Sequence, residues 1–421
     1  MLRNIIFAML IQCLFISCIG QDTRGRGGYT RGRKLDNQTK PGAASLHQYL
    51  PLLKEKKVAL FANHTSMIEN VHLADTLQKL GVNIKVIFGP EHGFRGKADA
   101  GEKVSTYKDS ATGITVISLY GNKLKPGKED LKDIDVMLFD IQDVGVRFYT
   151  YISSLQYYME AAIENNKHLI VLDRPNPNGH YVDGPVLDTS FRSFVGMQPV
   201  PVVYGMTIGE YAQMIFGEHW YDKKAYNWNQ GEFDLTVIPC TNYDHTKYYE
   251  LPIAPSPNLP NMQSIYLYPS TCFFEGTVLS EGRGTTAPFQ QFGDPSLPKN
   301  LHSFTPVSMP GAKNPKHMNK TCYGWTIGGN AEEVRTKLNN QLQVQYLIDA
   351  YSAFPDKVNF FLPSKTGKLS DYFFNKLAGN AKLMQQIKEE KSEEKIRESW
   401  KKDIEAFKEI RKQYLLYKDF E

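Results

Sequence analysis

The sequence predicts an α/β protein: a Rossmann-like or flavodoxin-like parallel-sheet domain at residues 45–235, followed by a smaller α+β domain at residues 236–421. Three observations support this fold class. Short apolar runs rich in Val and Ile recur from about residue 45, helical periods lie between them, and polar side chains follow the runs. Continuous apolar strands alternating with amphipathic helices indicate a parallel sheet covered on both faces.

The first domain is predicted to contain six strands and a candidate seventh. Each of the six is an apolar run of four or five residues, short enough for a buried strand. The candidate last strand, residues 233–239, precedes a change to Pro- and Tyr-rich sequence, which predicts the domain boundary. The six runs are 58–62, 84–88, 115–119, 136–139, 169–172 and 200–204.

Helices are predicted between these strands at residues 71–80, 150–165 and 207–220. In the third, Thr207 and Glu210 have the spacing of a capping box, in which each side chain satisfies a backbone N–H of the first turn. The second carries one apolar face, formed by Ile152, Leu155, Met159 and Ala162.

The C-terminal segment 369–417 is predicted to be a charged helical array with one apolar stripe. Its charges are typical of a solvated surface, and its aromatic residues are typical of a core. We assign this segment no catalytic role. The stripe consists of Ile387, Ile396, Trp400, Ile404, Phe407, Ile410 and Leu415.

The N-terminus has the pattern of a secretory signal, with Arg3 before an apolar stretch too short to span a membrane comfortably. Residues 1–18 end in Phe-Ile-Ser-Cys, which resembles a lipobox whose Cys18 is lipidated. Cleavage near Gly20 by an ordinary signal peptidase is the alternative. Residues 19–44 are then a flexible tether, and the protein is an exported bacterial lipoprotein, periplasmic or anchored to the outer membrane.

Composition excludes several classes of protein. The net charge of +4 comes partly from one arginine cluster at residues 24–34, so nucleic acid is not expected as a partner. Cys240, Cys272 and Cys322 leave room for one disulfide at most. No cysteine spacing fits a zinc site, so we expect no metal.

Polar residues gather directly after the predicted strands. The carboxyl ends of parallel strands meet at one edge of a sheet, where ligands bind. For any single Asp or Asn there, capping of the next helix is the competing interpretation. The candidates are His64 after the first strand, Glu91, His92 and Arg95 after the second, Asp143, Arg147 and Tyr149 after the fourth, and Asp173 and Arg174 after the fifth.

Glu91 is the strongest of these candidates. Gly89, Pro90 and Gly93 bend the backbone around it and favour a side chain that enters a cleft. His92 is adjacent, and neighbouring side chains usually point in different directions. The loop has neither the Gly-Lys-Ser/Thr ending of a Walker A motif nor a Gly-x-Gly-x-x-Gly pattern, which argues against a nucleotide.

The second domain contributes its own polar cluster. Asn258 lies in a Pro-rich loop, while Glu275 and Arg283 are flanked by glycines that favour backbone turned toward a ligand. A Gly/Pro-rich connecting loop is the equally weighted alternative.

Long ordered motifs carry a resemblance to a known family. The sequence looks like the NamZ-type exo-β-N-acetylmuramidases, peptidoglycan hexosaminidases long described as a domain of unknown function. The resemblance covers residues 45–418, and Ser280-Glu281 stands where Ser-Val or a similar small apolar residue is expected before Gly-Arg-Gly. The motifs are GPEHGFRGKADAG, DIQDVGVRFYTYISSL, VLDRPNPNG, VDGPVLD, PVPVVYGMTIGEYA, PSPNLPNM, LYPSTCFFEGT and EGRGTTAPFQQFG.

The resemblance implies release of N-acetylmuramic acid from the non-reducing ends of peptidoglycan fragments during cell-wall recycling. It also implies that the active site lies in the cleft between the two domains. It implies Glu91 as the general acid/base, while Asp173, Asp143 and Glu275 compete for the second catalytic role. In an N-acetyl sugar, the substrate's own acetamido oxygen can replace the enzyme nucleophile.

Substrate contacts follow from the chemistry of muramic acid. Its lactyl carboxylate suits a planar guanidinium, which Arg174, Arg283 or Arg147 could supply. The other expected contacts to the substrate are His64, His92, Arg95, Asp143, Tyr149 and Asn258. Partners are then peptidoglycan-derived saccharides, with the membrane reached through the lipid alone, and no organic cofactor is expected.

Two other classes of function compete with this interpretation. A non-catalytic glycan-binding lipoprotein would not require three ionisable groups such as Glu91, Asp143 and Asp173. A nucleotide- or flavin-binding oxidoreductase would require a glycine-rich phosphate loop after residues 58–62, where Asn63-His64-Thr65 stands instead.

Overall fold

The computed structural model describes residues 38–421 except 92, 97–105 and 223–232. Residues 38–421 form one compact unit. The predicted signal, Cys18 and most of the tether lie outside the described residues. The predicted division at residues 235/236 stays a prediction.

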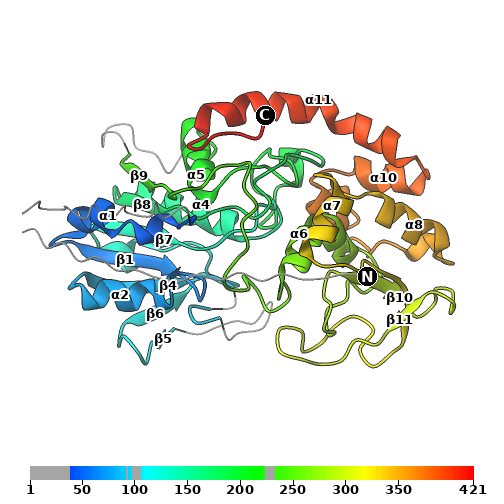
Figure 1. Cartoon of the computed structure of the whole chain (residues 1–421), viewed down its shortest axis with the longest axis horizontal. Helices are drawn as coiled ribbons and strands as arrows, with labels where there is room; N and C mark the ends of the chain where they lie inside the picture. Colours follow the sequence, from blue (N-terminus) through cyan, green and yellow to red (C-terminus); the bar gives the residue numbers. More distant parts are fainter. Residues whose placement is uncertain (1–37, 92, 97–105, 223–232) are drawn as a thin grey trace, which may run out of the picture. The chain divides into compact units, whose positions relative to one another are not determined.

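A seven-stranded sheet forms the first half of this unit (Figure 1). Its six parallel strands have the order β6-β4-β1-β7-β8-β9, and the short β5 pairs antiparallel at the edge. Counting the parallel strands alone, this is the 3-2-1-4-5-6 order of the Rossmann fold. The strands are β1 (Lys57–Ala62), β4 (Asn83–Gly89), β5 (Tyr107–Lys108), β6 (Thr115–Ser118), β7 (Val136–Asp140), β8 (His168–Leu172) and β9 (Leu235–Ile238).

Helices cover both faces of the sheet, as predicted. One face packs Val58 and Leu60 against α1 (Leu46–Leu53) and α2 (Leu73–Lys79). The other packs against α3 (Lys128–Leu131), α4 (Tyr151–Glu164) and α5 (Ile208–Gly217). The predicted apolar face of α4 is buried there: Ile152, Leu155, Met159 and Ala162 are at most 1% exposed.

Two predicted elements of the first half differ from the structure. Residues 200–204 are not a strand; Val203 forms only isolated bridges to Val146 and Asp183. Pro201 has no N–H to donate to a ladder, which explains the difference. The helix predicted at 71–80 begins two residues later, because Val71–His72 (β3) pairs with Met67–Ile68 (β2).

The second half combines short helices with a small antiparallel sheet. The sheet has the order β10-β12-β11 and does not pair with the large one. Its elements are α6 (Met262–Thr271), β10 (Gln291–Asp294), β11 (His302–Phe304), β12 (Cys322–Thr326), α7 (Ala331–Leu338) and α8 (Gln345–Ala353), with the 3-10 helix η4 (Cys272–Gly276) after α6.

The chain ends in the predicted helical array: α9 (Phe373–Ala378), α10 (Lys382–Lys388) and α11 (Glu393–Arg411). Ile396, Trp400 and Phe407 are buried along α11. In Figure 1, α11 (red) runs from α10 toward α5, so the chain returns to its first half. The Arg411 guanidinium makes that contact by donating to the carbonyl of Gly205 at 2.7 and 2.9 Å.

Short 3-10 helices complete the described part: η1 (Gly42–Ala44), η2 (Thr189–Phe191), η5 (Lys357–Asn359), η6 (Leu369–Asp371) and η7 (Lys412–Tyr414). Among the described helices, none has the length and apolar content needed to cross a membrane. Cys240, Cys272 and Cys322 are buried free thiols.

Candidate active site

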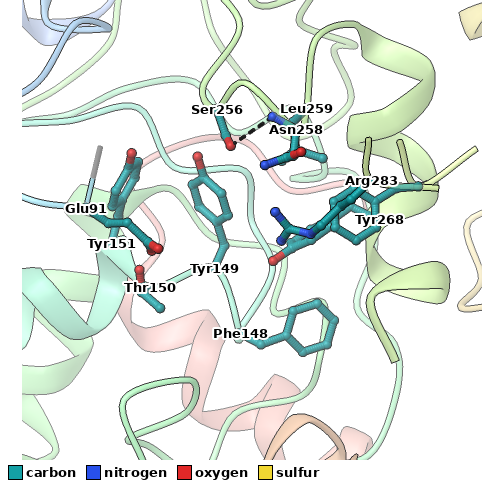
Figure 2. Close-up of a pocket in the computed structure, with 11 residues that line it drawn as sticks. Glu91, Phe148, Tyr149, Thr150, Tyr151, Ser256, Asn258, Leu259, Tyr268 and Arg283 are labelled. Carbon is teal, nitrogen blue, oxygen red and sulfur yellow. Dashed lines mark hydrogen bonds between the residues drawn. The ribbon is translucent and has the colours of Figure 1, made fainter. Parts of the chain in front are cut away.

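A small pocket of about 60 Å³ lies at the carboxyl edge of the sheet and is lined from both halves of the chain (Figure 2). It combines one carboxylate, one guanidinium and several aromatic rings, the mixture expected of a ligand site. Its lining residues are Glu91, Phe148, Tyr149, Thr150, Tyr151, Ser256, Asn258, Leu259, Tyr268, Arg283 and Phe289.

Glu91 reaches the pocket from a turn at the end of β4. The turn is closed by a hydrogen bond from the Gly93 N–H to the Pro90 carbonyl, 3.0 Å long. Gly93 has a φ of +74°, which favours glycine at that position. Of the lining residues that the structure describes, Glu91 is the one carboxylate.

The residues after β7 supply the aromatic wall. Gly145 has a φ of +73°, and a Cβ there would lie 2.1 Å from the side-chain oxygen of Asn176, so only glycine fits. The Asp143 carboxylate accepts hydrogen bonds from the Gly145 N–H at 2.6 Å and from the Tyr204 hydroxyl. Asp143 thus holds the loop behind the pocket; it does not line the pocket.

Tyr149 and Tyr151 present hydroxyl groups beside Glu91. The Tyr149 hydroxyl donates to the Pro255 carbonyl at 2.9 Å, and the Tyr151 hydroxyl accepts from the Asn63 side-chain amide at 3.0 Å. Burial raises the pKa of both phenols, so both remain protonated near neutral pH. Both phenols are therefore neutral hydroxyl groups in the wall of the pocket.

Arg283 faces the pocket from the second half. Figure 2 shows its side chain and that of Glu91 on opposite sides of Tyr149. Glu275 lies 2.6 Å and Glu281 lies 3.3 Å from the guanidinium, whose carbon lies 5.0 Å from the centre of the Phe289 ring. Burial lowers the pKa of Arg283, but the two carboxylates outweigh burial and raise it, so the side chain stays cationic.

Asn258 is held at the rim by its own contacts. Its side-chain amide donates to the Gly311 carbonyl at 2.8 Å, and its backbone N–H donates to the Ser256 hydroxyl at 3.2 Å (Figure 2). The structure therefore brings together four of the predicted residues: Glu91, Tyr149, Asn258 and Arg283.

Two arginines predicted to bind substrate are instead hydrogen-bonded to groups inside the protein. Arg147 is fully buried and donates to the carbonyls of Pro185, Val200 and Leu377, each within 2.8 Å. Burial lowers its pKa to about 9. Arg174 binds the Asp140 carboxylate through two nitrogens at 2.6 and 2.8 Å. Neither side chain lines the pocket.

Arg95 also points elsewhere. Its guanidinium binds Asp109 at 2.8 Å and Asp75 at 3.1 Å, and the pKa of Arg95 is raised chiefly by the hydrogen bonds with Asp109. The His64 Nε2–H donates to the Ala254 carbonyl oxygen at 2.9 Å, and His64 is not a lining residue. His92 lies outside the described residues.

Asp173, predicted as a second catalytic group, is a buried structural carboxylate. One oxygen accepts from the N–H groups of Arg174 and Gly209, and the other from the hydroxyls of Thr207 and Tyr417. Burial raises its pKa to about 6. Glu275, the third candidate, binds Arg283 behind the pocket and does not line it.

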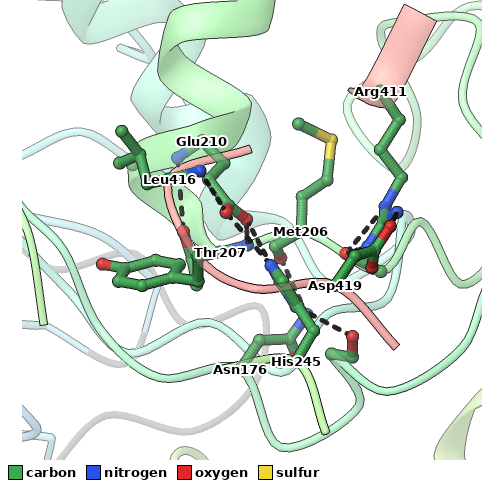
Figure 3. Close-up of polar contacts among 12 residues, drawn as sticks. Asn176, Met206, Thr207, Glu210, His245, Arg411, Leu416 and Asp419 are labelled. Atoms are coloured by element: carbon green, nitrogen blue, oxygen red, sulfur yellow. Dashed lines mark hydrogen bonds and ion pairs between the residues drawn. The ribbon is translucent and has the colours of Figure 1, made fainter. Parts of the chain in front are cut away.

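The C-terminal tail packs against the first turn of α5 and against His245 (Figure 3). The Glu210 carboxylate accepts from the Leu416 N–H at 2.8 Å and lies 3.0 Å from the His245 ring nitrogen. Arg411 pairs with Asp419 at 2.7 Å. The Tyr417 hydroxyl of the same tail donates to the Asp173 carboxylate at 2.5 Å, so the tail contributes to the burial of Asp173.

The other lining residues were not predicted as site residues: Phe148, Thr150, Tyr151, Ser256, Leu259, Tyr268 and Phe289. The sequence could have indicated Phe148 to Tyr151 as site residues. They continue the loop that follows the end of a parallel strand, where ligands bind.

Comparison with known proteins supports one family along nearly the whole described chain. Residues 58–263 match the N-terminal model of the exo-β-N-acetylmuramidase NamZ, and residues 266–417 match the C-terminal model. The chain belongs to the NamZ family. A curated relative, the peptidoglycan β-N-acetylmuramidase NamZ of Bacillus subtilis strain 168, is 37% identical over 398 residues, which cover 88% of this chain and 89% of the relative.

Two solved NamZ-like structures share the fold. Both are DUF1343 family proteins from Bacteroides fragilis NCTC 9343. One has a TM-score of 0.80 at 46% identity, covering 91% of this chain and 99% of its own. The other has a TM-score of 0.72 at 29% identity, covering 90% and 99%. Membership of the NamZ family and the Rossmann-like fold are thus both confirmed.

Proposed function

We propose that this chain is an exo-acting glycoside hydrolase that releases N-acetylmuramic acid from the non-reducing ends of peptidoglycan fragments, as part of cell-wall turnover. The observation that carries the proposal is that Glu91 and Arg283 face one small pocket. Cleavage of a glycosidic bond requires an acid, and recognition of the lactyl carboxylate suits a guanidinium. The family relationship supports the same activity.

Glu91 acts as the general acid and then as the general base. Its carboxyl proton passes to the glycosidic oxygen as the C1–O bond breaks, and the carboxylate later removes a proton from the water that attacks C1. Since Glu91 is the one carboxylate among the described lining residues, we assign the nucleophile to the substrate's own acetamido oxygen. The hydroxyls of Tyr149 and Tyr151 are placed to orient that group.

Arg283 binds the lactyl carboxylate. Of the three arginines considered, Arg147 and Arg174 are committed to internal partners, whereas Arg283 lines the pocket. Glu275 and Glu281 hold the guanidinium from behind, which fixes its plane before substrate binds.

Export and lipid anchoring at Cys18 belong to the same proposal, because the substrate lies outside the cytoplasmic membrane. The support is the signal-like N-terminus. Incorporation of labelled palmitate that disappears in Cys18→Ala would support the anchor, and equal labelling of both proteins would reject it.

The test of the function compares chromogenic β-N-acetylmuramide with the matching β-N-acetylglucosaminide, using wild type and Arg283→Lys. Lysine keeps the charge between Glu275 and Glu281 but lacks the planar fork. We expect muramide-selective hydrolysis by wild type, and a kcat/KM for the muramide about 10- to 100-fold lower in Arg283→Lys with a smaller loss for the glucosaminide. A folded wild type that binds muropeptides but cleaves neither substrate would indicate the glycan-binding lipoprotein instead.

A further inference from the structure

Three half-buried aromatic rings form a row beside the pocket, which we call the aromatic row: Tyr120, Phe194 and Tyr157. The Tyr120 and Phe194 ring centres are 6.4 Å apart, and those of Phe194 and Tyr157 are 6.2 Å apart with nearly parallel planes at 15°. The rings come from three segments: the loop after β6, the loop after η2, and α4. None of them belongs to the pocket lining described above.

The row begins at Glu91. Tyr120 shares a hydrogen bond with Glu91, and the pKa of Tyr120 is raised by burial first and then by the negative charge of Glu91. The charges of Arg283 and Glu275 also act on this phenol. Tyr120 therefore lies within electrostatic reach of both functional side chains of the pocket, and it packs beside Phe194, which in turn stacks on Tyr157.

The link between the row and Glu91 matches the needs of an exo-acting enzyme. Leu259 and Phe289 are each 1% exposed and Phe148 is 2% exposed, so apolar side chains close the pocket on their side. The glycosidic oxygen must lie within hydrogen-bond reach of Glu91 to receive its proton. The saccharide that leaves must therefore pass close to Glu91, and Tyr120, an aromatic side chain outside the lining, interacts with Glu91.

We propose that the aromatic row binds the leaving saccharide, with a pyranose of the N-acetylglucosamine type packing its apolar C–H face on Phe194 and Tyr157. This inference rests on the proposed function and extends it from the bound muramic acid to the aglycone. Aromatic rings suit this ligand because they offer a large apolar surface at low conformational cost, while the phenol hydroxyls can bond to sugar hydroxyls. The row is continuous with the pocket through Tyr120, which links the two subsites at Glu91.

The test measures the ratio of two kcat/KM values, one for the disaccharide N-acetylmuramyl-β-1,4-N-acetylglucosamine and one for methyl β-N-acetylmuramide, whose leaving group cannot cover the row. In Phe194→Ala we expect this ratio to fall at least about fivefold, since one aromatic contact is removed. Phe194→Leu keeps the apolar volume but lacks a flat ring, and it should also lower the ratio. Because it preserves packing, it tests the loss of the ring separately from a folding defect.

Phe216→Ala is the matched control, because Phe216 stacks on Tyr221 at 6.0 Å and 17° but lies in α5 outside the row and the pocket. Its ratio should equal that of wild type. A Phe194→Ala ratio equal to wild type, or equal losses on both substrates, would overturn the subsite while leaving the muramidase function intact. Wild type that cleaves neither substrate would instead refute the proposed function on which the subsite depends.

Discussion

Burial separates the acidic residues that follow the strands into two groups. Asp143 and Asp173 are at most 5% exposed, and burial raises the pKa of each to about 6. Glu91 is more exposed and lines the pocket. A raised pKa in this protein thus marks carboxylates that hold loops, whereas the proposed catalytic acid is identified by its position.

Asp143→Asn should change how stability depends on pH. Because the folded pKa is raised from 3.8 to about 6, the stability contributed by the protonated side chain is present below pH 3.8 and is lost as pH rises through 6. The loss amounts to at most about 3 kcal/mol. We expect the Tm of Asp143→Asn relative to wild type to rise between pH 4 and pH 7, measured by calorimetry. A constant difference would show that Asp143 does not titrate in this range.

The sequence could place a residue in the pocket lining where the backbone itself carried a signal. Glu91 stands in a turn that requires glycine, and that requirement is visible in the sequence. Arg147 and Arg174 carry no such signal, because their partners are backbone carbonyls up to 230 residues away or a buried aspartate. Residue type alone does not distinguish an arginine that binds a ligand from a buried arginine that is hydrogen-bonded to other parts of the protein.

At the scale of elements, the local sequence pattern was sufficient to predict most strands of the sheet and the helices that cover it. The capping box predicted from Thr207 and Glu210 is present at the start of α5. Apolar runs located the six parallel strands, including the candidate at 233–239, which became β9. The run at 200–204 misled because it has strand composition without a strand's hydrogen bonds.

Thr207→Ala should destabilise the protein by about 1–2 kcal/mol. The Thr207 hydroxyl accepts from the Glu210 N–H at 3.3 Å and donates to Asp173 at 2.8 Å, so alanine leaves both groups without that partner. Thr207→Ser keeps the hydroxyl and is the matched control. Urea unfolding monitored by circular dichroism would measure both; a midpoint for Thr207→Ala equal to that of Thr207→Ser would argue against the cap.

At the scale of the whole molecule, the C-terminal tail returns to residues near the middle of the chain. The Tyr417 hydroxyl donates to Asp173 at 2.5 Å and accepts from the Cys240 N–H at 2.8 Å. The His245 N–H donates to the Lys418 carbonyl at 3.0 Å. The sequence predicted the helices of this segment but no partner for its last residues, since contacts between residues so distant in sequence leave no local pattern.

Tyr417→Phe should therefore lower the free energy of unfolding by about 1–3 kcal/mol, because it leaves two buried polar groups unpaired. Tyr414→Phe is the control: the Tyr414 hydroxyl donates to Glu218 at 2.7 Å in a partly exposed site, and its loss should cost less. Chemical denaturation of both variants checks the order. If Tyr414→Phe proved the more damaging, the tail would not be held at Tyr417.

The most direct test of the central claim follows cleavage of a reducing-end-labelled glycan with muramic acid at its non-reducing end. Wild type should release free N-acetylmuramic acid from that end first, and Glu91→Gln should reduce the rate about 10²- to 10⁴-fold with an unchanged Tm. Glu129→Gln, an exposed surface variant, should match wild type. Full activity in Glu91→Gln, or wild-type cleavage at internal bonds first, would contradict an exo-acting muramidase that uses Glu91 as its acid.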